Sequence, residues 1–206
     1  MNAVAQEDRP WELVVVVGAS AGGIEALQRF VRALPPNLPL ALLIVLHVPA
    51  SGSSLPQILA RAGAYPAAHA VDGEPIEPGR IMIAPPDHHL VVEGRIVRVR
   101  QTQREDGYRP AIDTLFRSAA QALGPNVVGV ILSGALSDGA QGLATIKRHG
   151  GLTLVQDPAE ARYGSMPHAA IDAAEPHHVL PVAEIAALVA GLAVRGAAAE
   201  ASQSVS

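Results

Sequence analysis

Short runs of consecutive apolar residues alternate, early in the chain, with a segment that repeats apolar residues at helical spacing. Residues 13–17 and 40–46 are continuous runs rich in Val, Leu and Ile. Such runs are typical of strands buried on both faces of a parallel sheet. The helical positions between them are Ile24, Leu27, Val31 and Leu34. With a further helix predicted over residues 53–61, this β-α-β-α order indicates right-handed crossovers and a parallel sheet.

The same alternation returns in the second half of the chain. An amphipathic helix is predicted over residues 112–123, before a buried strand over residues 127–132. The later predicted elements are a helix through residues 143–146, a strand at 152–155, a helix opened by Met166 and Pro167, and a last helix over 185–192. The doubly wound order therefore spans most of the chain.

The middle of the chain has a different pattern, rich in Pro and Gly. Residues 90–92 are apolar, and in residues 95–100 Ile96, Val97 and Val99 alternate with arginines. Glu93-Gly94 joins the two segments, which predicts a β-hairpin. We expect this hairpin to form an antiparallel edge of the parallel sheet. The predicted fold is α/β: a single doubly wound, mostly parallel sheet flanked by helices, with a small antiparallel hairpin. The catalytic domain is expected over residues 13–194, after an N-terminal extension at 1–12 and before a disordered tail at 195–206.

Composition narrows the class of protein. The chain has 206 residues, of which 49% are hydrophobic and 17% charged, as in globular proteins. Its net charge of −4 argues against nucleic acid or an anionic membrane as partner. It has no cysteine, which excludes disulfides and thiolate chemistry. The N-terminus does not resemble a signal peptide, and the apolar stretch at 38–48 is too short to span a bilayer, so we expect a cytoplasmic protein without membrane insertion.

Three polar residues follow three predicted strands. Ser20 follows the first strand, His47 ends the second, and Asp138 follows the strand at 127–132. Ligands of open α/β sheets bind beyond the carboxyl ends of the strands, so the three side chains are expected near one another. A nucleophile, a base and an orienting acid are the parts of a serine hydrolase site. Each residue alone has an ordinary structural interpretation: a helix cap for Ser20, a core or surface residue for His47, and a turn or cap for Asp138.

A dinucleotide site is the competing interpretation of the first loop, because Gly18-Ala19-Ser20-Ala21-Gly22-Gly23 is one residue away from Gly-x-Gly-x-x-Gly. Ser20 puts a side chain where the pyrophosphate must approach the backbone. His47 also ends the second strand, where a ribose-binding acid is required. We therefore predict no cofactor. Metal binding is not expected either, since His88-His89 and His177-His178 point to opposite faces if extended.

Several blocks in order resemble the catalytic domain of the CheB-type chemotaxis receptor methylesterases. They are VVGASAGGIEAL, IVLHVP, IAPPDHHL, RPAIDTLFRSAA, GVILSGALSDGAQGL and GSMPHAAI, which together cover about residues 13 to 192. The resemblance implies hydrolysis of glutamate γ-methyl esters on chemoreceptor cytoplasmic domains, and deamidation of glutamines there. It implies Ser20 as nucleophile, His47 as base and Asp138 as acid, with no metal or cofactor. It also implies an oxyanion or substrate loop that involves Ala21, Gly134, Ala135 and Met166.

Some positions depart from the pattern of that family. Ala21 stands for a threonine, Tyr108 for a histidine, and Ala135 and Leu136 for Met and Gly. Leu136 would be strained if the loop needs a positive φ. No room precedes Ser20 for a receiver domain, so control is expected from a separate response-regulator protein, from expression, or not at all. Two rival functions stay open: a serine hydrolase acting on another protein ester or amide outside chemotaxis, and a non-catalytic binding module.

Overall fold

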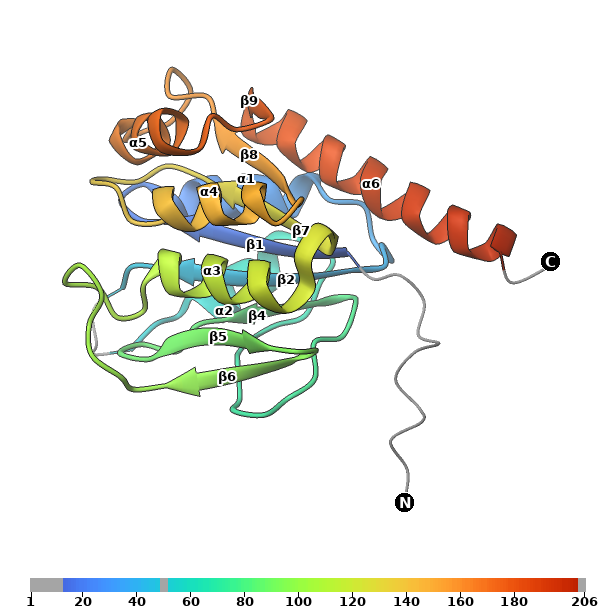
Figure 1. Cartoon of the computed structure of the whole chain (residues 1–206), viewed down its shortest axis with the longest axis horizontal. Coiled ribbons are helices and arrows are strands. Elements are labelled where there is room, and N and C mark those ends of the chain that lie inside the picture. Colours follow the sequence, from blue (N-terminus) through green and yellow to red (C-terminus); the bar gives the residue numbers. More distant parts are fainter. Residues whose placement is uncertain (1–12, 49–51, 204–206) are drawn as a thin grey trace.

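The computed structural model describes residues 13–48 and 52–203. Within this part, seven parallel strands form one sheet in the order β3-β4-β2-β1-β7-β8-β9. The sheet is the central layer in Figure 1, with helices on both faces. Its strands are β1 (Leu13–Ala19), β2 (Leu40–Leu46), β3 (Ala67–His69), β4 (Arg80–Ile83), β7 (Val127–Ile131), β8 (Leu152–Gln156) and β9 (His178–Leu180). The predicted α/β class and parallel sheet are confirmed.

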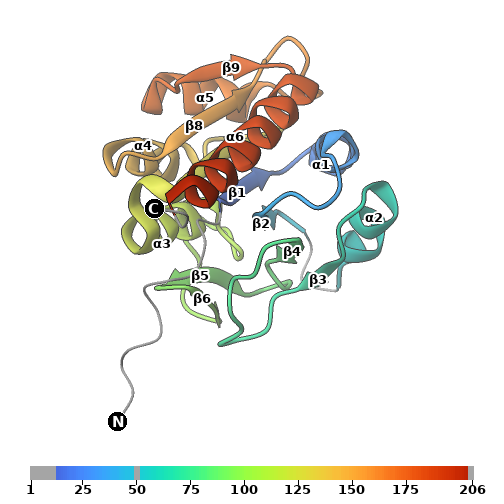
Figure 2. The same cartoon turned by 90° about the vertical axis from the view of Figure 1, so that its right-hand side faces the viewer.

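The two faces of the sheet carry two separate apolar cores. One face packs against α1 (Gly23–Ala33), α2 (Leu55–Ala62) and α6 (Val182–Gln203). The other packs against α3 (Ile112–Leu123), α4 (Ala140–Arg148) and α5 (Ser165–Ala174), as the turned view in Figure 2 shows. A 3₁₀ turn, Gly124–Asn126, links α3 to β7. Because both faces are covered, all seven residues of β1 and of β2 are buried, which explains their continuous apolar sequences.

The hairpin was predicted correctly as a hairpin but wrongly as an edge of the sheet. β5 (His89–Glu93) and β6 (Ile96–Arg100) form a separate two-stranded antiparallel sheet. The hairpin lies against α3, where the Val92 N–H donates to Ser118 Oγ at 3.0 Å. The edges of the main sheet are instead β3 and β9, each three residues long. Strands this short are defined by their backbone hydrogen bonds to a neighbouring strand, and the pattern of apolar residues does not predict those bonds.

The C-terminal helix is longer than predicted. α6 continues beyond Arg195 to Gln203, so the predicted disordered tail is wrong up to that residue. The segment from 196 onwards is rich in Ala, the residue with the strongest helix propensity. Residues 204–206, and the predicted N-terminal extension at 1–12, lie outside the described residues.

The strand order brings three loops to one edge of the sheet. β1 pairs with β2 on one side and with β7 on the other, in parallel. The segments after these three strands therefore emerge side by side, where the direction of winding changes. Among the described helices, none has the length and apolarity needed to cross a bilayer.

Candidate active site

Ser20 follows β1 directly, in a tight loop that leads into α1. Its backbone N–H donates to Ser133 O at 3.0 Å, and its carbonyl accepts from Gly23 N at 2.8 Å. The N-cap of α1 is Gly22, with a φ of 71°, and it makes no side-chain capping bond. Ser20 is therefore not the helix cap that its position also suggested, and its hydroxyl is available for another partner.

That partner is His47, at the end of β2. His47 Nδ1 lies 3.1 Å from Ser20 Oγ, and His47 Nε2 lies 2.7 Å from Asp138 Oδ2. A carboxylate accepts hydrogen bonds but does not donate them, so we assign the ring proton to Nε2. Nδ1 then accepts the Ser20 hydroxyl hydrogen. Both distances fall within the range of about 2.6–3.2 Å expected for a nucleophile, a base and its orienting group.

Asp138 is 5% exposed and lies at the beginning of α3 in space. Its Oδ2 accepts from Ile112 N at 2.7 Å, and its Oδ1 accepts from Asp113 N at 3.0 Å. These are the first two backbone amides of α3, which have no partner inside the helix. The positive end of the helix dipole also favours a carboxylate there. Asp138 is therefore fixed by two helix amides while Oδ2 also binds His47.

Of the remaining predicted site residues, Gly134 and Ala135 lie in the loop after β7. Met166 lies in the first turn of α5, and Ala21 follows Ser20 in the loop after β1. The Gly134 N–H donates to Tyr163 O at 3.0 Å, and the Gly134 carbonyl accepts from Met166 N at 3.0 Å. A Cβ at Gly134 would lie 2.3 Å from Met166 Cε, so the buried Met166 side chain packs beneath this loop. Within the described part of the chain, the backbone N–H groups of Ala21 and Ala135 make no hydrogen bond. These two amides, rather than that of Gly134, are available to a ligand.

Comparison with known proteins places the chain in one family. The sequence profile described as CheB methylesterase matches residues 15–189. The chain belongs to the CheB methylesterase family. A relative from Leptospira interrogans is 39% identical over 176 residues, which cover 84% of this chain and 91% of the relative. The crystal structure of the Thermotoga maritima CheB methylesterase catalytic domain matches with a TM-score of 0.84 and 29% identity, over 88% of this chain and 98% of that one.

Other relatives are longer than this chain. A protein-glutamate methylesterase/protein-glutamine glutaminase of Anaeromyxobacter dehalogenans is 40% identical over 84% of this chain. One from Pseudomonas aeruginosa is 36% identical over 89% of it. The matched regions span only 51% and 54% of these two relatives, so this chain corresponds to about half of their length. The predicted membership of the CheB methylesterase family is confirmed.

Two residues beside the candidate site, Tyr108 and Asp113, were not predicted to lie there. The Tyr108 ring stacks on the His47 imidazole, with centroids 3.8 Å apart and planes inclined by 6°. Asp113 is 3% exposed and accepts from Gly142 N at 2.5 Å. Burial raises the pKa of Asp113 from 3.8 to about 6, although the Gly142 N–H opposes this shift. For Tyr108, the departure from the family pattern was the only signal in the sequence.

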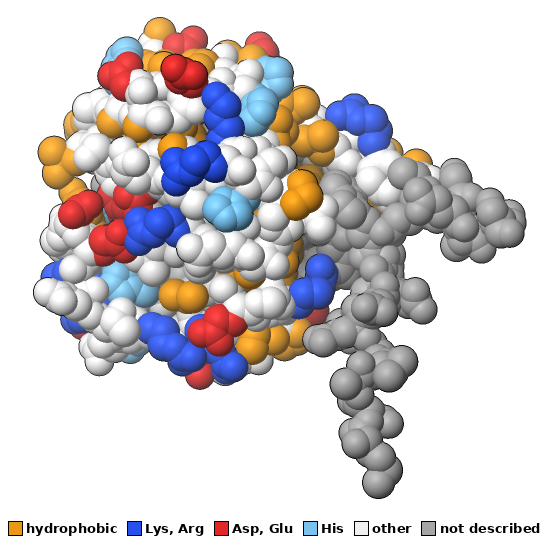
Figure 3. Space-filling model, in the orientation of Figure 1, with side chains coloured by type: hydrophobic (Ala, Val, Ile, Leu, Met, Phe, Trp, Pro, Cys, Tyr) orange, Lys and Arg blue, Asp and Glu red, His pale blue; other side chains and the backbone are white. Residues whose placement is uncertain are grey.

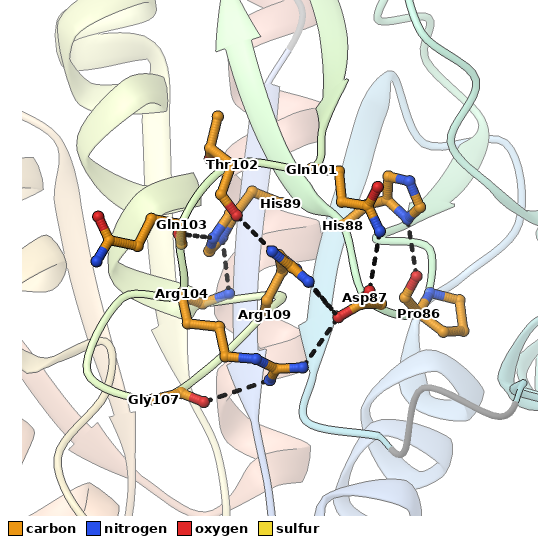
Figure 4. Close-up of polar contacts among 11 residues, drawn as sticks. Pro86, Asp87, His88, His89, Gln101, Thr102, Gln103, Arg104, Gly107 and Arg109 are labelled. Atoms are coloured by element: carbon orange, nitrogen blue, oxygen red, sulfur yellow. Dashed lines mark hydrogen bonds and ion pairs between the residues drawn. The ribbon is translucent and has the colours of Figure 1, made fainter.

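Arg109, the neighbour of Tyr108, contacts Asp87 through Nε at 3.0 Å and Nη2 at 2.8 Å. Figure 4 shows the Arg109–Asp87 pair. Arg104 lies beside it, and both arginines belong to the segment that leads into α3.

A cavity of about 340 Å³ opens near the loop that carries Ser20, but Ser20, His47 and Asp138 do not line it. Gly22 and Ser133 line it, together with the ion pairs Arg29–Glu160 and Arg162–Glu25. Because each arginine is paired with a glutamate, the cavity gives no strong preference for a charged ligand. On the face seen in Figure 3, acidic and basic side chains are likewise interspersed.

The first of the two histidine pairs, His88-His89, forms hydrogen bonds within the fold. His88 Nδ1 donates to Pro86 O at 2.9 Å, and His89 Nε2 donates to Gln103 O at 3.0 Å. No group of three or more His, Asp or Glu side chains among the described residues is arranged to hold a metal ion.

Proposed function

We propose that this chain hydrolyses glutamate γ-methyl esters on the cytoplasmic domains of chemoreceptors, with Ser20, His47 and Asp138 as a catalytic triad. The observation that carries this proposal is the continuous relay from Ser20 Oγ to His47 Nδ1 at 3.1 Å and from His47 Nε2 to Asp138 Oδ2 at 2.7 Å. Membership of the CheB methylesterase family supplies the substrate class.

The acylation step follows from these contacts. Ser20 Oγ attacks the ester carbonyl carbon while its proton moves to His47 Nδ1. Asp138 accepts the Nε2 hydrogen bond throughout, so it keeps Nδ1 free to act as base and stabilises the imidazolium that forms. The imidazolium then protonates the methoxy oxygen, methanol leaves, and the glutamyl group remains esterified to Ser20.

Water completes the cycle with the same residues. His47 Nδ1 removes a proton from water, the hydroxide attacks the acyl carbon, and the imidazolium returns this proton to Ser20 Oγ as the bond to the acyl carbon breaks. The glutamic acid that is released loses its remaining proton to solvent. A glutamine side chain can follow the same route with ammonia as the first product. His47 thus mediates the proton transfers at Ser20, at the leaving group and at the attacking water.

The backbone amides of Ala21 and Ala135 are the proposed oxyanion donors. Both are free of hydrogen bonds among the described residues. Ala21 directly follows the nucleophile, which is the usual position for one donor of an oxyanion hole. In comparable enzymes one such donor contributes about 3–4 kcal/mol to transition-state stabilisation. Gly134 and Met166 are proposed to shape the loop rather than to contact the oxyanion.

Methanol release from methylated chemoreceptor fragments tests this function. Wild-type protein is expected to release methanol, and Ser20→Ala is expected to abolish the release without loss of folding. Ser53→Ala is the matched control, since among the described residues Ser53 Oγ accepts only from Leu55 N, at the start of α2. Equal activity of wild type and Ser20→Ala would overturn the proposed triad.

A second candidate is a serine hydrolase for a different protein ester or amide. Leu136 favours it, because this side chain is 66% exposed on the loop after β7, where the family pattern has glycine. A fluorophosphonate probe separates the alternatives. Labelling of Ser20 without methanol release would indicate another substrate, whereas no labelling of folded protein would indicate a binding module.

A further inference from the structure

A strap of residues 101–111 joins β6 to α3 and carries Tyr108 against the candidate base. The planes of the Tyr108 and His47 rings are nearly parallel, inclined by 6°, and the ring centroids are 3.8 Å apart. Such close parallel stacking fixes the plane of both rings. The imidazole is thus held at three places: Nδ1 at Ser20, Nε2 at Asp138, and one face at Tyr108.

Asp87 anchors the strap from the segment before β5. Its carboxylate accepts from Gln101 Nε2 at 2.9 Å, from Arg104 Nη2 at 3.0 Å, and from Arg109 Nη2 at 2.8 Å. The Arg109 hydrogen bond is the main reason why the pKa of Asp87 is lowered. Figure 4 shows the two guanidinium groups converging on this carboxylate. Arg109, the neighbour of Tyr108, is therefore tied to a fixed point of the fold.

Backbone contacts hold the rest of the strap. Arg109 Nη1 donates to Thr102 O at 2.6 Å, so the arginine spans the strap itself. His89 Nε2 donates to Gln103 O at 3.0 Å, and Ala111 N donates to His89 Nδ1 at 3.2 Å. His89 is 1% exposed, so it fixes both arms of the strap from inside the protein.

A narrow turn then presents Tyr108. Glu105 and Tyr108 exchange two backbone hydrogen bonds, of 3.0 and 2.8 Å. The Glu105 carboxylate also binds Thr114 Oγ1 at 2.6 Å and the guanidinium of Arg117, both on α3. The turn is thus attached to the same helix whose first amides hold Asp138. Tyr108 and Asp138 are fixed relative to one structural element, and His47 lies in contact with both.

We infer that Tyr108 is a positioning residue of the proposed reaction, which holds the His47 imidazole in the plane that directs Nδ1 at Ser20 Oγ. This inference rests on the proposed function. The aromatic ring also stabilises the imidazolium that forms during acylation, because a cation is attracted to the face of a ring. The phenol hydroxyl has no hydrogen-bond partner among the described residues. The ring, not the hydroxyl, performs this role.

Three variants test the inference. Tyr108→Phe keeps the stacked ring and is expected to retain kcat within about twofold. Tyr108→Ala removes the ring and is expected to lower kcat about threefold to tenfold with little change in KM, which corresponds to the usual strength of an aromatic or cation–π contact. Gln103→Ala is the matched control on the strap, since the Gln103 side chain is exposed and only the Gln103 backbone carbonyl forms a hydrogen bond within the described part of the chain.

A spectroscopic readout keeps this test independent of the substrate. In the NMR spectrum, the carbon-bound ring protons of His47 are expected upfield in wild type and Tyr108→Phe, because the stacked ring shields them. They move downfield in Tyr108→Ala. If wild type lacks methylesterase activity, the proposed function fails whatever the spectra show. If wild type is active and Tyr108→Ala matches it in kcat, or if the His47 signals do not move, the positioning role is overturned.

Discussion

At the scale of single residues, Leu136 has an unfavourable backbone conformation beside the candidate site. Its φ is 66°, a left-handed conformation that costs an ordinary L-residue about 1–2 kcal/mol. Its side chain is 66% exposed and contributes little burial in return. Glycine would remove the strain, at the cost of about 0.4–1 kcal/mol from its greater freedom in the unfolded chain. We expect Leu136→Gly to raise the free energy of unfolding by about 0.5–1 kcal/mol, measured by urea denaturation.

Leu136→Ala is the control for this prediction. It removes the same exposed side chain but retains a Cβ, so the strain remains and no stabilisation is expected. Equal gains for the two variants would show that loss of the exposed leucine side chain, and not the backbone, is responsible. From the sequence, Leu136 could be expected to be strained only if the loop needed a positive φ. The φ of 66° in the structure meets this condition.

At the scale of elements, two carboxylates connect the N-termini of α3 and α4. Asp138, which precedes α4, accepts from the first two amides of α3. Asp113, in the first turn of α3, accepts from Gly142 N in the first turn of α4. Each helix therefore supplies the acid that satisfies amides of the other. The exchange orders both helices around Asp138, but it places two acidic groups close together in the interior.

This arrangement predicts a pH-dependent stability. Because the pKa of Asp113 is raised from 3.8 to about 6 in the folded state, the folded protein binds a proton that the unfolded chain releases between these values. The contribution of Asp113 to the free energy of unfolding therefore falls as the pH rises from about 4 to 6. Asp113→Asn cannot titrate, so its stability relative to wild type is expected to increase over this window, by at most about 3 kcal/mol.

Urea denaturation of both proteins at several values between pH 4 and 7 measures this difference. Asp172→Asn, at an exposed position on α5, serves as control for the loss of one negative charge. A difference between Asp113→Asn and wild type that stays constant across the series would contradict the prediction. The backbone amide of Asp113 still holds Asp138 in this variant, so the geometry of the candidate site is expected to be retained.

At the scale of the whole molecule, the features predicted from the sequence were the buried strands and the residues at the ends of parallel strands. β1 and β2 were predictable because both faces of the sheet are covered. The proximity of Ser20, His47 and Asp138 was predictable because each ends or follows a parallel strand. The pairing of β3, β4 and β9 was not predictable, because short strands depend on neighbours distant in sequence. The Tyr108–His47 stack was hidden for the same reason: it forms only when the strap is folded across the end of β2.

The coupling between sheet and site can be tested at Gly18 in β1. A Cβ there would lie 2.3 Å from Ile112 Cγ2, and Ile112 is branched close to its backbone, so the first turn of α3 must shift. That turn donates the amide that holds Asp138 Oδ2. We expect Gly18→Ala to cost about 1–3 kcal/mol of stability. Since a displacement of about 1 Å costs about 100-fold in rate, kcat per folded molecule should fall at least about tenfold.

Gly129→Ala in β7 is the matched control, because it creates a similar clash in the same apolar layer. Its Cβ would lie 2.7 Å from Ile146 Cδ1 and 2.8 Å from Leu143 Cδ1, both on α4, without touching the turn that holds Asp138. Both variants should lose stability in thermal unfolding, but only Gly18→Ala should lose kcat after correction for the folded fraction. If the loss of activity in both variants is explained by the loss of folded protein alone, the contacts from β1 through Ile112 to Asp138 do not position the Asp138 carboxylate.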